Sequence, residues 1–146
     1  MTITSIKTSV VQFLPNWETV QRGQIWQGGK LVIEYDAERL AHVRAWFRGA
    51  LFGELNVIVK FHPSGQIYTG SCVEEVRSDG TGGHGMTIGL EPKAFEVSVP
   101  LDSSHVEIWF HAFYQTTSYY EAWDSRYGQN YWFPVKDQSR HDEQKT

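Results

Sequence analysis

The most constraining feature of this sequence is an alternating pattern in residues 106–114. One face of a strand with period two would carry an apolar set: Val106, Ile108, Phe110, Ala112 and Tyr114. The opposite face would carry Glu107, Trp109, His111 and Phe113. A solvated strand face usually carries Thr, Ser, Lys and Glu rather than Trp and Phe. The pattern therefore predicts a strand with one face in a core and an unusually aromatic outer face.

A second strand with the same arrangement follows at residues 131–135. Tyr131, Phe133 and Val135 are predicted to point inward, and Trp132 outward. The segment before it reads Trp123-Asp124-Ser125-Arg126-Tyr127-Gly128-Gln129-Asn130-Tyr131. Because Asp, Ser, Gly and Asn favour turns, this segment is predicted to be an aromatic, turn-rich loop between two strands.

The rest of the chain continues the pattern of short strands. Further strands are predicted in residues 3–13, 31–35, 45–52, 55–61, 66–76, 86–90 and 94–99. Asp36 follows one of them and is placed to cap a single helical turn, because its side chain can accept free backbone N–H groups. About eight short strands with at most one short helix predict an all-β fold, an antiparallel β-sandwich or barrel.

Length and composition indicate one globular domain in residues 1–136. The 146 residues are enough to bury a core, and 40% of them are hydrophobic. Residues 78–85 are rich in Gly and are predicted to form a loop. Residues 137–146 are charged and nearly free of apolar side chains, so we expect a disordered tail.

Charge and cysteine content exclude several classes of function. A net charge of -4 argues against nucleic acid and against anionic membrane surfaces, since both require a basic patch. The single Cys72 cannot form an internal disulfide and is expected to be an ordinary buried thiol rather than a nucleophile. No apolar run reaches transmembrane length, and no signal peptide is recognisable. The default expectation is a soluble cytoplasmic protein.

The segment 106–135 resembles the C-terminal end of the starch- and glycogen-binding modules of carbohydrate-binding family twenty-one and its glycogen-targeting relatives. Trp123, Asp124, Gly128, Asn130 and Tyr131 stand at the spacing of that family's loop, after a similar hydrophobic strand. The resemblance implies an antiparallel β-sandwich of starch-binding-module or immunoglobulin-like type, with Asn130 contacting sugar and Trp123 in the platform. Residues 29–40 also resemble small bacterial proteins of unassigned function that share this ending.

The residue types themselves also favour a sugar ligand. A pyranose ring lies with its apolar face on Trp or Tyr, while Asn, Asp or Gln hydrogen-bond its hydroxyls. The candidate ligand-binding residues are Trp109, Tyr119, Tyr120, Trp123, Asn130 and Trp132. The alternative is that Trp123 and Tyr131 only anchor the loop to the sandwich, while Asp124 and Asn130 cap its turns.

The histidines give little support to a metal or to catalysis. None of the six stands at a metal-ligand spacing, so neither a metal site nor a cofactor is predicted. Glu107 and His111 lie on the same strand face and are candidates for an acid–base pair, although a surface pair without a catalytic role is favoured.

Three functions remain open from the sequence. The first is non-catalytic binding of a glycan, α-glucan-like, through the aromatic face. The second is an accessory protein of a bacterial biosynthetic pathway that binds a peptide or a small hydrophobic molecule. The least favoured is a small enzyme that uses Glu107 and His111, or a carboxylate from the loop. The aromatic face equally suits a homodimer interface, because both kinds of contact bury Trp and Tyr.

Overall fold

The computed structural model describes residues 6–36, 38–39, 45–47, 50–77, 87–115 and 118–137. These residues form fourteen strand segments. In chain order they are β1 (Thr8–Phe13), β2 (Thr19–Arg22), β3 (Ile25–Trp26), β4 (Lys30–Tyr35), β5 (Ala45–Phe47), β6 (Ala50–Phe52), β7 (Glu54–His62), β8 (Ile67–Ser71), β9 (Val73–Arg77), β10 (Thr87–Pro92), β11 (Phe95–Ser98), β12 (His105–Gln115), β13 (Tyr119–Asp124) and β14 (Tyr131–Lys136).

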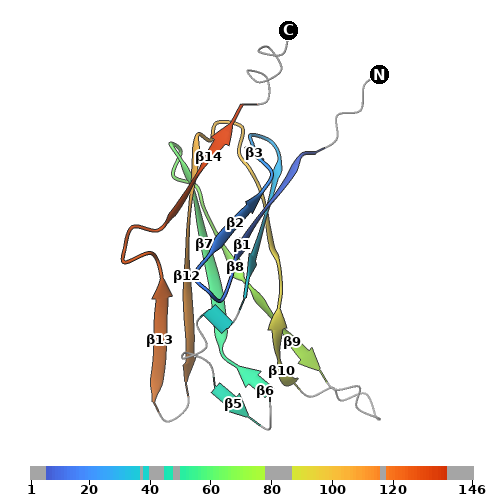
Figure 1. The fold of residues 1–146 in the computed structure, drawn as a ribbon, viewed down its shortest axis with the longest axis vertical. Helices are drawn as coiled ribbons and strands as arrows, with labels where there is room; N and C mark the ends of the chain where they lie inside the picture. Colours follow the sequence, from blue (N-terminus) through green and yellow to red (C-terminus); the bar gives the residue numbers. More distant parts are fainter. Residues whose placement is uncertain are drawn as a thin grey trace.

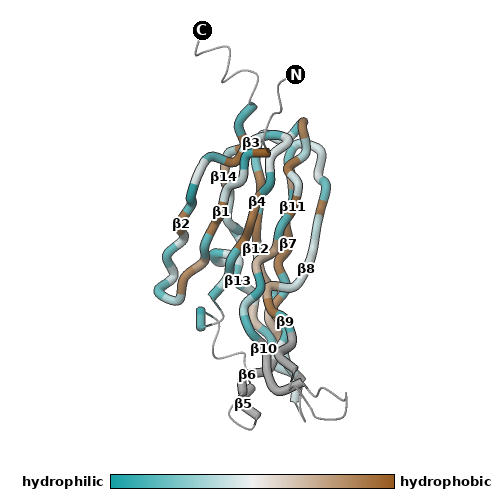
Figure 2. Tube along the Cα trace, turned by 90° about the vertical axis from the view of Figure 1, so that its right-hand side faces the viewer, coloured by the Kyte–Doolittle hydropathy of each residue, from teal (hydrophilic) through white to brown (hydrophobic). Residues whose placement is uncertain are grey.

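Two main sheets form a sandwich-like, all-β fold, as the strand pattern predicts (Figure 1). One sheet has the order β11-β4-β1-β2, and Figure 2 faces it. The other has the order β3-β14-β12-β7-β8, with β13 also paired to β12. β12 is the longest strand and pairs with three others, so the segment with the clearest sequence pattern is the centre of its sheet.

Two strand pairs depart from the expected antiparallel arrangement. β1 and β4 are parallel, and so are β3 and β14. Parallel neighbours need a crossover connection, which for β1 and β4 is the segment containing β2 and β3. That segment pairs β2 with the first sheet and β3 with the second, so it crosses between the two sheets near Gly23.

The core lies between the two sheets and follows the period-two pattern. The inward residues of β12 (Val106, Ile108, Phe110 and Ala112) are fully buried, and those of β7 (Leu55, Val57, Val59 and Phe61) are almost fully buried. The first sheet contributes Val11, Phe13, Leu31 and Ile33. Rings of opposite sheets touch, with the Phe13 and Phe110 centroids 4.6 Å apart in an edge-to-face pair. Hydrophobic burial across this interface therefore holds the sheets together.

Some local predictions differ from the structure, and others fall outside it. Residues 45–47 and 50–52 form not one strand but the antiparallel pair β5 and β6, and β9 pairs with β10 instead of continuing β8. Asp36 caps a short turn as predicted, since its Oδ1 accepts the backbone N–H of Glu38 at 3.0 Å. The predicted loop 78–85 and residues 138–146 lie outside the described residues. In the part of the chain that is described, no helix has the length and hydropathy to cross a bilayer.

Cys72 is expected to be inert toward thiol reagents while the protein is folded. Its side chain is fully buried, and burial raises the pKa of the thiol to about 12. Since only the thiolate reacts, labelling should be suppressed by about a thousandfold or more relative to an exposed thiol. Titration with a chromogenic disulfide at pH 7, with and without denaturant, measures this. Rapid labelling of the native protein would contradict the buried placement.

Candidate functional site

The loop between β13 and β14 has an unusual backbone. Arg126, Tyr127 and Asn130 have φ values of 48°, 59° and 59°, in the left-handed region that side chains with a Cβ disfavour. Trp17, in the turn between β1 and β2, has a φ of 66°. No other non-glycine residue of the described chain has a positive φ. Such conformations concentrate at functional sites when the surrounding structure enforces them, and here all four lie in two neighbouring segments.

Short hydrogen bonds hold the loop in this shape. The backbone N–H of Asn130 donates to the Ser125 carbonyl at 2.6 Å, and the N–H of Gly128 donates to Ser125 Oγ at 3.1 Å. The Trp132 indole N–H donates to the Gln129 carbonyl at 2.8 Å. Ser and Gly thus perform the turn-forming role expected of them in the sequence.

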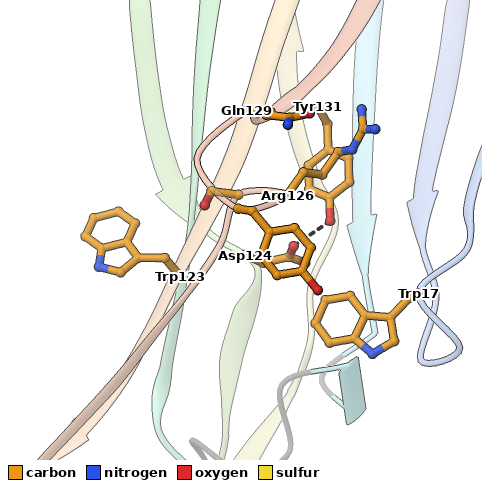
Figure 3. Close-up of a pocket in the computed structure, with 8 residues that line it drawn as sticks. Trp17, Trp123, Asp124, Arg126, Gln129 and Tyr131 are labelled. Atoms are coloured by element: carbon orange, nitrogen blue, oxygen red, sulfur yellow. Dashed lines mark hydrogen bonds between the residues drawn. The ribbon is translucent and has the colours of Figure 1, made fainter.

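This loop and the β1–β2 turn enclose a cleft of about 520 Å³ (Figure 3). Its lining residues are Trp17, Trp123, Asp124, Ser125, Arg126, Tyr127, Gln129 and Tyr131. Trp17 and Trp123 are each 56% exposed, and Tyr127 is fully exposed. Figure 3 shows Trp17 approaching from the β1–β2 turn, whereas Trp123 stands on the other side of the loop. The cleft therefore combines exposed aromatic walls with polar groups from one loop.

A buried polar network lies beneath the cleft. Asp124 is 3% exposed and accepts hydrogen bonds from Tyr35 at 2.8 Å, from Arg39 Nε at 2.7 Å and from Tyr131 at 2.5 Å. Burial and the hydrogen bond to Asp124 raise the pKa of Tyr131 to about 12, so this phenol remains a donor at neutral pH. The pKa of Tyr35 is raised further, by burial and by the Asp124 charge. Both oxygens of the carboxylate at the floor of the cleft thus accept hydrogen bonds from protein donors.

Arg39 joins this network to the turn that carries Trp17. Its Nη1 donates to the carbonyls of Leu14 and Glu18 at 3.1 and 3.0 Å, and its guanidinium lies 4.7 Å from the centroid of a Trp17 ring. Burial lowers the pKa of the guanidinium, but the hydrogen bond and charge of Asp124 outweigh that effect and raise it. The capped turn after Asp36 brings Arg39 to this position. The wall and the floor of the cleft are therefore held by a single cation.

The outer face of the second sheet carries most of the aromatic residues predicted from sequence. Trp109, Tyr119, Trp123 and Trp132 alternate with inward residues of β12, β13 and β14, so they share this face. Trp132 stacks on His62 at 4.8 Å, and Trp123 packs against His111 at 4.1 Å. Trp123 also lines the cleft, so the outer face and the cleft adjoin at that residue.

The two remaining candidates are placed differently. Asn130 lies at the edge of the outer face, where its Nδ2 donates to Glu107 Oε2 at 2.6 Å. Tyr120 points to the opposite side of β13 from Tyr119 and stacks on Tyr114 at 4.7 Å. Tyr114 packs against the core. Tyr120 is therefore separated from the other five candidates by the sheet itself.

The predicted pair of Glu107 and His111 does not form. Glu107 bonds to His62 at 2.8 Å, and His111 bonds to Glu121 at 2.7 Å. Glu107 and His111 each bond to a residue on a neighbouring strand. Such a cross-strand neighbour lies closer than a residue two same-face positions away on the same strand. The hydrogen bond from His111 lowers the pKa of Glu121. Within the described ranges, no three His, Cys, Asp or Glu residues are arranged to hold a metal ion.

Trp123 is the only one of the six sequence candidates among the residues that line this cleft. The residues missed include Trp17, Arg126 and Tyr127 in the lining, and Arg39 beneath it. Arg126 and Tyr127 belong to the loop of residues 123–131, which the sequence already singles out. The many aromatic and polar side chains in that loop were the sequence feature that could have identified them. Trp17 stands next to the turn-forming Pro15-Asn16 and was available as an aromatic residue in a turn. Nothing local distinguishes Arg39 from an ordinary surface arginine.

Comparison with known proteins gives a family and no function. No curated protein and no solved structure matches the chain significantly. The model of a family of unknown function, DUF6209, matches residues 2–136. Because that match covers most of the 146 residues, the chain belongs to the DUF6209 family.

Proposed function

We propose that this protein is a non-catalytic glycan-binding protein and that the cleft beside the loop of residues 125–130 is its binding site. The observation that carries the proposal is the exposure of three aromatic side chains, Trp17, Trp123 and Tyr127, around one cleft of about 520 Å³. Exposed aromatic side chains gathered at a hollow, rather than scattered singly, mark an interaction site.

The chemistry of the lining suits a sugar ring. Trp and Tyr offer flat surfaces for the C–H face of a pyranose, and Ser125, Gln129 and Arg126 supply donors and acceptors for its hydroxyls. The outer face continues the aromatic surface from Trp123, so a longer glycan has further rings on which to lie.

The strained loop supports a binding role in a second way. Left-handed residues other than glycine cost about 1–2 kcal/mol each. Tyr127 has such a backbone, but its side chain is fully exposed, so packing of the ring does not offset this cost. A loop fixed before the ligand arrives loses less entropy on binding, which favours affinity.

Replacing Trp17 or Trp123 with Ala is expected to weaken glycan binding by about tenfold to a hundredfold. Each variant removes a ring that a sugar would cover, and truncation of a central aromatic contact commonly has an effect of this size. Isothermal titration calorimetry with a panel of neutral and acidic oligosaccharides, including maltooligosaccharides and β-cyclodextrin, measures it. The neutral α-glucans belong in the panel because the loop resembles starch-binding modules.

Tyr68→Ala is the matched control for these variants. Tyr68 is also an exposed aromatic residue, but it lies on β8, an edge strand of the sheet that contains Trp123. Its removal should leave the affinity unchanged. Absence of heat and of a change in Trp fluorescence with every oligosaccharide, for a protein with an intact folded spectrum, would refute glycan binding.

A peptide ligand is the second candidate, favoured by one observation. β2 is an edge strand of the first sheet, and its Thr19 and Gln21 line a second hollow beside the cleft. An extended peptide can add to such an edge and place side chains in adjacent aromatic pockets. Protection of the β2 amides from hydrogen exchange by an unstructured peptide, and not by a sugar, is the signature expected of this alternative.

A further inference from the structure

The second hollow makes the cleft part of a longer groove. It has a volume of about 390 Å³ and is lined by Trp17, Thr19, Gln21, Arg126, Tyr131, Trp132 and Phe133. Three of these residues, Trp17, Arg126 and Tyr131, also line the first cleft. The two hollows therefore adjoin, and Arg126 lies where they meet.

The charges along this groove do not cancel. Asp124 and Arg126 are the charged residues that line it. The Asp124 carboxylate is buried and already bonded to Arg39, Tyr35 and Tyr131, so its charge is neutralised by Arg39. Arg126 is exposed, and its guanidinium lies 5.9 Å from the centroid of the Tyr131 ring. No carboxylate of the described chain comes within ion-pair distance of it. The groove thus presents one uncompensated positive charge.

We propose that the ligand is an anionic glycan, whose ring carries a carboxylate or a sulfate ester that Arg126 binds while the ring lies on the neighbouring aromatic side chains. This inference rests on the proposed glycan-binding function and adds the chemical class of the sugar. Guanidinium is planar and presents paired N–H donors, which match an oxyanion better than they match a single hydroxyl. The backbone of Arg126 has a φ of 48°, and its carbonyl accepts the N–H of Gln129 at 3.2 Å, so the loop fixes the point from which the side chain extends.

The net charge of the chain does not oppose this contact. The total of -4 is spread over the whole molecule, and charges separated by more than about 8 Å are largely screened at physiological salt. The guanidinium, in contrast, would touch its ligand. Affinity for the anionic sugar should therefore fall as salt concentration rises, whereas affinity for a neutral sugar should not.

The test uses oligogalacturonate and its methyl ester, in which each charged carboxylate is replaced by a neutral ester, titrated calorimetrically into the full chain. The native protein is expected to bind the acid about tenfold more tightly than the ester. Arg126→Gln should abolish the preference, so that the acid and the ester bind with equal affinity, while Arg126→Lys should keep part of the preference. Arg22→Gln is the matched control, since Arg22 is an exposed arginine on β2 that bonds to Gln12.

Each outcome separates this inference from the proposed function. Equal binding of acid and ester by the native protein, or an acid preference that survives in Arg126→Gln, overturns the anionic ligand and leaves glycan binding in place. A sulfated oligosaccharide in a third titration distinguishes the two anionic groups, since stronger binding of that ligand, also lost in Arg126→Gln, assigns the site to sulfate. Failure of acidic, esterified and neutral sugars alike overturns both proposals.

Discussion

Replacing Arg39 with Met should lower the free energy of unfolding by about 3–5 kcal/mol, because removal of one partner leaves the other charge buried and uncompensated. In the native protein Arg39 has no exposed side-chain surface and Asp124 has 2%. The substitution also removes the donors to the carbonyls of Leu14 and Glu18. Equilibrium denaturation in urea, followed by far-UV circular dichroism, measures the change.

Two further variants show whether the effect comes from the buried pair. Arg22→Met removes an exposed arginine and should change stability by less than about 0.5 kcal/mol. Adding Asp124→Leu to Arg39→Met removes the orphaned charge and should recover part of the loss, as replacement of buried ion pairs by apolar residues often does. An Arg39→Met protein within about 1 kcal/mol of the native stability would show that the network contributes little.

The same network holds both walls of the proposed binding cleft. Arg39 fixes the β1–β2 turn through two carbonyls and packs beneath Trp17, while Asp124 fixes the start of the loop of residues 125–130. Both walls of the cleft are thus attached to one buried ion pair that spans the two sheets. A substitution that loosens this pair should therefore weaken ligand binding as well as stability, even though Arg39 itself does not line the cleft.

The local pattern of the sequence predicts the core well. Period-two alternation in β12 places Phe110 inward and Trp109 outward, and the same rule places Tyr131 and Trp132 correctly in β14. These assignments depend only on neighbouring residues and on the geometry of an extended chain. The all-β class follows from repetition of the pattern, because no segment offered a competing helical period.

The partners of the site residues depend on contacts that no local pattern reveals. Arg39 and Asp124 are 85 positions apart, and nothing near either predicts that both are buried. The pairing of Glu107 with His62 spans 45 positions, and it displaces the predicted partner His111 on the same strand. Parallel pairing of β1 with β4 likewise depends on how the chain crosses between sheets. The contacts of the site residues therefore depend on long-range topology, whereas the local pattern is enough to predict which strand face lies in the core.

Phe110→Ala should destabilise the protein by about 3–5 kcal/mol, since it removes a ring from the middle of the core and leaves a cavity. Phe110 is fully buried, and its ring centroid lies 4.6 Å from that of Phe13 and 4.3 Å from that of Tyr35, both in the opposite sheet. The loss should appear as a lower urea midpoint with an unchanged slope.

The matched comparison is Phe113→Ala, on the same strand and of the same chemistry. Phe113 is half-buried on the outer face, where its ring lies 5.4 Å from His111 and 5.8 Å from Tyr119 by centroid distance. Its removal creates no enclosed cavity, so the expected cost is about 1 kcal/mol. If the two variants lost equal stability, the outer face would be as enclosed as the core, for instance in a dimer, and the aromatic surface beside the cleft would not be free to bind a glycan. A clear difference leaves that surface accessible to solvent, as the proposed glycan-binding function requires.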